Sequence, residues 1–68
     1  MDQADQLFDT EKAGEYIQKP PATLAWWRVV GRGPRYLKIG RAVRYRKCHL
    51  DEFLEAAIQF PAHSDDAA

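Results

Sequence analysis

The chain has 68 residues, a length that predicts a single small domain. Its ten Lys and Arg residues balance ten Asp and Glu residues, so its formal net charge is zero. One cysteine excludes an internal disulfide and a zinc site made of several thiolates, which fits a reducing cytoplasm. The sequence has no apolar stretch long enough to cross a membrane and no signal peptide, so we expect a soluble cytoplasmic protein.

Two short helices joined by a tight turn are predicted in the first half of the chain. Asp9 is a suitable N-cap for a helix over residues 10–18, because its carboxylate can accept hydrogen bonds from the free amides of the first turn. The pair Pro20–Pro21 ends that helix. A second helix over residues 21–30 would begin at this pair and end at Gly31 in the left-handed conformation. This order of elements is a helix-turn-helix.

A β-hairpin and a third helix are predicted in the second half. Residues 35–46 alternate apolar and basic side chains around Gly40 and Arg41, which suit a two-residue turn. The alternation predicts a hairpin with apolar residues on one face and cations on the other. A helix over residues 48–60 is expected next, because five apolar residues recur at helical spacing. These residues are Leu50, Phe53, Leu54, Ala57 and Ile58.

Together, these elements predict a fold that is mainly α with a small β-hairpin, in the order of a winged helix-turn-helix domain. We expect the domain to cover residues 7–60, between a disordered N-terminus over residues 1–6 and a disordered acidic tail over residues 61–68. In the second helix, Leu24 and Trp27 are predicted to face the core.

The basic residues are concentrated in one part of the sequence. Residues 19–47 hold nine of the ten Lys and Arg residues and no Asp or Glu. Surfaces that serve only solubility mix both signs of charge, whereas clustered cations suit the phosphates of nucleic acid. This distribution predicts double-stranded DNA as the partner.

Twelve residues are predicted to bind DNA. Arg41 at the hairpin tip suits the narrow minor groove, and the neighbouring cations suit phosphates. The second helix offers Thr23 and Arg28 for polar contacts, whereas its outer stripe of Ala22, Ala25, Trp26 and Val29 is apolar. That stripe can pack on thymine methyl groups, or it can form a protein interface anchored by Trp26. The complete set is Ala22, Thr23, Ala25, Trp26, Arg28, Val29, Arg32, Arg35, Lys38, Arg41, Arg44 and Arg46.

The sequence offers little for catalysis or for a cofactor. Its two histidines, His49 and His63, lack a matching nucleophile and carboxylate. The adjacent Cys48 and His49 are poorly spaced to bind one metal ion. We therefore expect no enzyme activity, no metal, no cofactor and no small-molecule substrate.

A series of short motifs, taken in their order along the chain, resembles a known family. The motifs are residues 9–17, Thr23-Leu24, Trp27-Arg28, Gly31 to Pro34, Tyr36 to Gly40, Val43 to Arg46 and Leu50 to Leu54. They are similar to those of the excisionase family of winged helix-turn-helix proteins, which is related in fold to the MerR DNA-binding domain. The resemblance covers roughly residues 7–58. It fails in the outer stripe of the second helix, which is apolar here and usually polar or basic in that family.

The resemblance implies a sequence-specific, architectural DNA-binding protein of a prokaryotic mobile element. Such an excisionase, or recombination directionality factor, would bend DNA, bind it cooperatively by head-to-tail self-association and direct an integrase toward excision. The second helix would enter the major groove and the hairpin the adjacent minor groove. Two alternatives remain open. One is an AlpA-like transcriptional regulator of a prophage or integrative element, and the other is a protein-interaction or phage DNA-packaging module.

Overall fold

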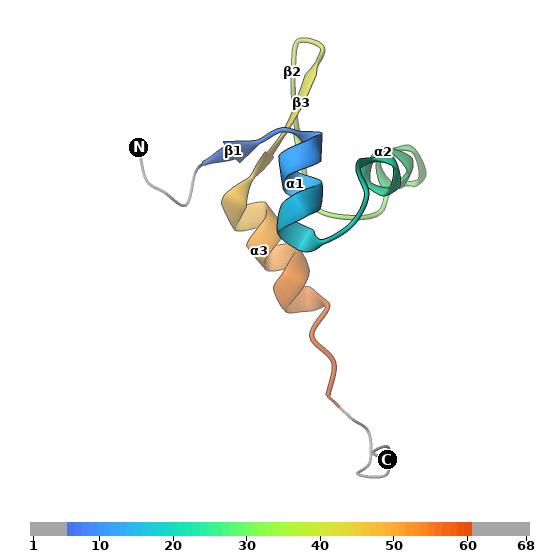
Figure 1. Cartoon of the computed structure of the whole chain (residues 1–68), viewed down its shortest axis with the longest axis vertical. Helices are drawn as coiled ribbons and strands as arrows, with labels where there is room; N and C mark the ends of the chain where they lie inside the picture. The colour runs from blue at the N-terminus through green and yellow to red at the C-terminus, as the bar shows by residue number, and fades with distance from the viewer. Residues whose placement is uncertain (1–5, 61–68) are drawn as a thin grey trace.

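The order of helices and strands is known from a computed structural model that describes residues 6–60. Within this range, three helices accompany a three-stranded antiparallel sheet, a mixed α and β arrangement (Figure 1). The elements are β1 (Leu7–Phe8), α1 (Thr10–Ile17), α2 (Pro21–Val30), β2 (Leu37–Ile39), β3 (Ala42–Arg46) and α3 (Lys47–Ala56). The ends predicted to be disordered lie outside the described residues, apart from Gln6, whose carbonyl accepts a hydrogen bond of 2.9 Å from the amide of Lys47.

Helix α1 begins and ends through specific backbone contacts. The Asp9 carboxylate accepts a hydrogen bond of 2.8 Å from the amide of Lys12, which confirms the predicted N-cap. Gln18 has a left-handed conformation with φ of 62°, so α1 ends one residue earlier than predicted. The amide of Lys19 then donates to the carbonyl of Gly14 at 2.9 Å. A β-carbon on Gly14 would lie 2.5 Å from the carbonyl oxygen of Lys19, so only glycine allows this close return.

Helix α2 has the predicted bounds. It begins with Pro21 in its first turn, where a missing amide hydrogen costs nothing, and it ends before Gly31. Gly31 has φ of 76°, and its amide donates to the carbonyl of Trp27. The predicted orientation of the helix is also confirmed. Leu24 is fully buried, and the Trp27 ring packs on the ring of Phe53 with their centroids 5.4 Å apart.

A first strand, β1, was not predicted. Leu7 pairs with Arg46 and Phe8 pairs with Tyr45, so β3 lies between β1 and β2 in the sheet. A strand of two residues shows no alternation in the sequence, and its existence depends on a partner far along the chain. The predicted hairpin therefore supplies two strands of a three-stranded sheet.

The hairpin forms around the predicted turn, but the predicted separation of its faces is wrong. Lys38 pairs with Val43, and Leu37 pairs with Arg44. Directly paired residues of antiparallel strands point to the same face of the sheet. Each face therefore carries apolar and basic side chains together. The reason is the two-residue turn, because it pairs each odd-numbered residue of one strand with an even-numbered residue of the other. The large apolar residues are odd-numbered in both strands, so they are not paired with one another across the hairpin.

The core lies between the inner face of the sheet and the three helices. Its buried members are Ala13, Ile17, Leu24, Tyr45 and Leu50. Partly buried side chains surround them, namely Phe8, Tyr16, Trp27, Val43 and Phe53. Figure 1 shows α1 between α2 and α3, with the β2–β3 hairpin projecting beyond the helices. No helix of the described residues is long and apolar enough to cross a membrane.

Helix α3 is shorter than predicted. It covers Lys47–Ala56 rather than residues 48–60, and Ala57 is its C-cap. Leu50 is buried, but Leu54 and Ile58 are 38% and 53% exposed. The apolar spacing continues past the last residue that packs against the core, so it overestimated the length of the helix.

Candidate nucleic-acid interface

The described residues are basic as a group and divide into two regions of opposite charge. They contain all ten Lys and Arg residues but only six of the ten Asp and Glu residues. These acids lie just before or within α1 and within α3, and none lies between residues 19 and 47. We call the part that consists of α2, the loop between α2 and β2, and the β2–β3 hairpin the basic region. Its cations are Arg28, Arg32, Arg35, Lys38, Arg41, Arg44 and Arg46.

The outer stripe of α2 is exposed and apolar. Trp26 is 56% exposed and Val29 is 82% exposed. Ala22 is exposed as well, whereas Ala25 and Thr23 are half-buried. Ala22, Trp26 and Val29 lie on the side of α2 away from Leu24, and the two half-buried residues lie at its flanks. The stripe carries no charge, so any contact that it makes depends on shape and apolar area.

The cations of the hairpin lie on two faces. Lys38 shares a face with Val43, and Tyr45 on that face contacts Arg28 of α2, so Lys38 points to the side of the sheet that faces α2. Arg44 and Arg46 point to the other face, and Nη1 of Arg44 donates 2.8 Å to the carbonyl of its neighbour Val43. The structure therefore does not bring all the predicted cations onto one face.

Arg41 occupies the tip of the hairpin, in the predicted position. Gly40 before it has φ of 63°, which is the conformation that a tight hairpin turn requires at its first central residue. Arg41, Arg32 and Arg35 are all exposed. Their guanidinium groups are therefore available to a partner in solution.

Arg28 has an internal role that the sequence did not reveal. Its Nη1 donates a hydrogen bond of 2.7 Å to the hydroxyl of Tyr45, and its guanidinium carbon lies 5.7 Å from the ring centroid of Tyr36. The two tyrosine rings are 6.1 Å apart. We call these three residues the Arg28 cluster. It joins α2 to both arms of the hairpin at their base, away from the tip.

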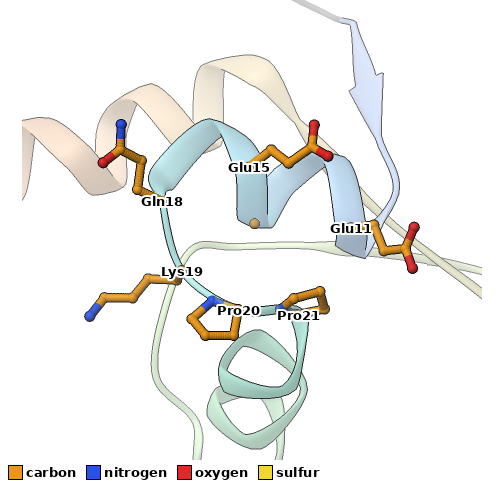
Figure 2. A pocket seen from close by; sticks show the side chains of 7 residues that line it. Glu11, Glu15, Gln18, Lys19, Pro20 and Pro21 are labelled. Carbon is orange, nitrogen blue, oxygen red and sulfur yellow. The ribbon is translucent and has the colours of Figure 1, made fainter.

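Two hollows beside α2 differ in charge. The hollow at the α1–α2 turn is lined by Glu11 and Glu15 of α1, the turn residue Lys19 and the two prolines that follow it (Figure 2). With two carboxylates and one ammonium group it is unsuited to a phosphate. The other hollow lies against the loop between α2 and β2 and has arginine side chains in its lining.

One cation of the predicted basic stretch is paired instead with an acid. Nζ of Lys47 lies 3.2 Å from Oδ2 of Asp51, and the hydroxyl of Tyr16 donates to Oδ1 of the same carboxylate. The hydrogen bond from Tyr16, followed by that from Lys47, lowers the pKa of Asp51. The hydrogen bond to Asp51 and its negative charge raise the pKa of Lys47. This trio joins α1 to α3 and neutralises the end of the basic stretch.

Residues 6–60 contain no group of three or more His, Cys, Asp or Glu side chains placed to hold a metal ion. A scan against protein-family models gives no match, and a search of curated proteins gives no significant match.

Proposed function

We propose that the chain is a winged helix-turn-helix protein that binds double-stranded DNA, with β2 and β3 as the wing. The observation that supports this most strongly is the basic region. Seven cations lie on α2, the loop and the hairpin, without a carboxylate among them. Such a distribution favours a polyanion, because each phosphate neutralised by a cation releases counterions.

The proposed complex places α2 in the major groove and the hairpin tip in the adjacent minor groove. The exposed stripe of α2 would pack on thymine methyl groups, with Thr23 at its half-buried edge. Arg41 would enter the narrow minor groove, and the other exposed cations would contact phosphates. Arg28 would hold α2 and the hairpin at the angle that both contacts need, as its bond to Tyr45 suggests.

Within this class, we favour an architectural role as an excisionase or recombination directionality factor of a mobile element. A domain this small contacts few bases, so affinity would come mainly from charge and from several copies bound side by side. The hollow at the α1–α2 turn has two carboxylates and one ammonium group in its lining, whereas the basic region is positively charged. This difference in charge suits head-to-tail contact between neighbouring copies. An integrase is the proposed protein partner.

The first experiment measures binding to duplex DNA across a salt series. Affinity should fall steeply as salt rises, and Arg41→Ala should reduce the salt slope by about one unit. Lys12→Ala is the matched control, because it removes an exposed cation from α1 outside the basic region and should leave the slope unchanged. A flat salt response of the unmodified protein would contradict DNA binding.

A second experiment tests the architectural role. Circularly permuted DNA fragments with the binding site at different positions should migrate differently in a gel if the protein bends DNA. Migration independent of site position at saturation would favour the AlpA-like transcriptional regulator. One observation favours the protein-interaction alternative: the exposed Trp26 in an apolar stripe, a residue type common in the centres of interfaces.

A further inference from the structure

The hollow beside the loop between α2 and β2 has an unusual set of side chains. Three of its lining residues are arginines, Arg28, Arg32 and Arg35, and two more are Tyr36 and His49. Its remaining lining residues are Gly31, Gly33 and Pro34, so none of the lining residues is acidic. We call this feature the loop hollow.

The shape of the loop hollow is fixed by packing. Gly33 has φ of 85°, and a β-carbon there would lie 2.6 Å from Cε3 of Trp27, so the loop rests directly on that ring. Pro34, the next residue, is buried. On the other side, Arg28 is held by the hydroxyl of Tyr45 and by the ring of Tyr36. One guanidinium and the loop are therefore in place before any ligand arrives, which reduces the entropy lost on binding.

His49 adds a second, independent observation. Its Nδ1 atom is buried and has no hydrogen-bond partner among the described residues. Buried polar atoms are nearly always paired, so an exception needs a physical explanation. Pro34 in the loop beside it has no amide hydrogen to offer. The imidazole of this lining residue therefore serves as a local reporter of what binds in the loop hollow.

We propose that the loop hollow binds a phosphate group. Guanidinium groups are planar and bind phosphate oxygens through paired hydrogen bonds. Three arginines line this one hollow, whereas a surface that is merely solvated does not require such a cluster. The same chemistry would recognise a phosphodiester of DNA or a free phosphate monoester. The proposal does not require that the protein binds DNA, so the two can fail separately.

Glu52 provides an internal counter-test. It lines the adjacent hollow together with His49 and Arg35. Its carboxylate opposes an anion in the loop hollow. Neutralising it by Glu52→Gln should therefore strengthen phosphate binding, whereas neutralising Arg35 should weaken it.

The experiment follows the imidazole resonances of His49 by NMR while inorganic phosphate is added at constant ionic strength. We expect a saturable shift, a dissociation constant raised about fivefold by Arg35→Gln, and one lowered about twofold by Glu52→Gln. Arg41→Gln is the control, because it removes the same charge from the distant hairpin tip and should change the constant little. Amide spectra report whether each variant is folded.

Two results would overturn the proposal: the absence of a saturable His49 shift in the folded, unmodified protein, or an equal loss of affinity in Arg41→Gln and Arg35→Gln. Addition of duplex DNA then separates the sources of phosphate. If DNA displaces inorganic phosphate and shifts His49 itself, the site holds a phosphodiester. If phosphate stays bound while DNA binds elsewhere, the site belongs to a separate phosphorylated ligand.

Discussion

The Tyr45 hydroxyl accepts a hydrogen bond of 2.7 Å from Nη1 of Arg28, and this bond joins the central strand β3 to α2. Tyr45 is 1% exposed, so its hydroxyl has few alternatives to this donor. Tyr45→Phe keeps the ring but leaves the guanidinium without its partner. We expect the free energy of unfolding to fall by about 1 to 2 kcal/mol in urea denaturation. Tyr36→Phe is the control, because its ring and the contact with Arg28 remain, and it should lose less.

The same substitution also tests the positioning role of Arg28. If the bond sets the angle between α2 and the hairpin, Tyr45→Phe should weaken DNA binding without changing the salt slope, since no cation is removed. Equal stability of Tyr45→Phe and the unmodified protein would show that the bond contributes nothing. Unchanged DNA affinity would show that the angle does not depend on it.

Gly33 and Gly31 form a matched pair of glycines with positive φ. A β-carbon at Gly33 would meet the Trp27 ring at 2.6 Å, whereas one at Gly31 meets nothing within 4 Å. Gly31→Ala should cost about 1 to 2 kcal/mol from backbone strain alone. Gly33→Ala adds a collision with a packed ring and should cost about 2 to 4 kcal/mol in total. Urea denaturation of both variants measures the difference, and equal losses would contradict the close packing of the loop on Trp27.

The trio of Tyr16, Lys47 and Asp51 predicts a defined dependence of stability on pH. The pKa of Asp51 is lowered in the folded protein, so its contribution is complete above its ordinary value of 3.8 and is lost as pH falls through the lowered value. The pKa of Lys47 is raised, so its contribution is complete below 10.5 and is lost as pH rises beyond it. Between these limits Asp51→Asn should be less stable than the unmodified protein.

Urea denaturation of Asp51→Asn and the unmodified protein at several pH values measures this effect. The stability difference should shrink when the solution is acidified below the ordinary pKa of the carboxyl group. Glu55→Gln, which removes an exposed carboxylate from the same helix, controls for net charge. A stability difference that stays constant down to strongly acidic pH would contradict the predicted role of the charge on Asp51.

Trp26 distinguishes the two interpretations of the α2 stripe. Its side chain is 56% exposed, so Trp26→Ala should change the free energy of unfolding by less than about 0.5 kcal/mol. If α2 enters the major groove, the variant should bind DNA about tenfold more weakly with an unchanged salt slope. Ile58→Ala is the control, because that residue is similarly exposed but lies beyond α3. Unchanged DNA affinity, with loss of binding to a protein partner such as an integrase, would assign the stripe to protein recognition.

The helix boundaries were predictable because single residues with strong local preferences mark them. Asp9 caps α1, Pro21 opens α2 and Gly31 closes it, and each acts through backbone groups within a few residues. The end of α3 has no comparable marker. Its apolar spacing continues through Ile58, and only the packed structure shows that this residue stays exposed.

The candidate site was predictable in composition but less so in geometry. The cations of the basic region are evident from the sequence, yet the pairing of Leu37 with Arg44 places apolar and basic side chains together on each face of the hairpin. The internal role of Arg28 depends on Tyr45, a residue on a different element with no periodic relation to α2. His49 also lacked any local signal, because it lines a hollow together with residues of a loop distant in the sequence.

The pairing of β1 with β3 determines when the chain can fold during its synthesis. Leu7 and Phe8 are synthesised before α1, but their partners Tyr45 and Arg46 are added only after both α1 and α2 have been made. The core also lacks Tyr45 and Leu50 until then. Helical turns can form early from local contacts, whereas the closing of the sheet joins the two ends of the domain and must wait. Folding of this domain is therefore completed only after β3 has been translated.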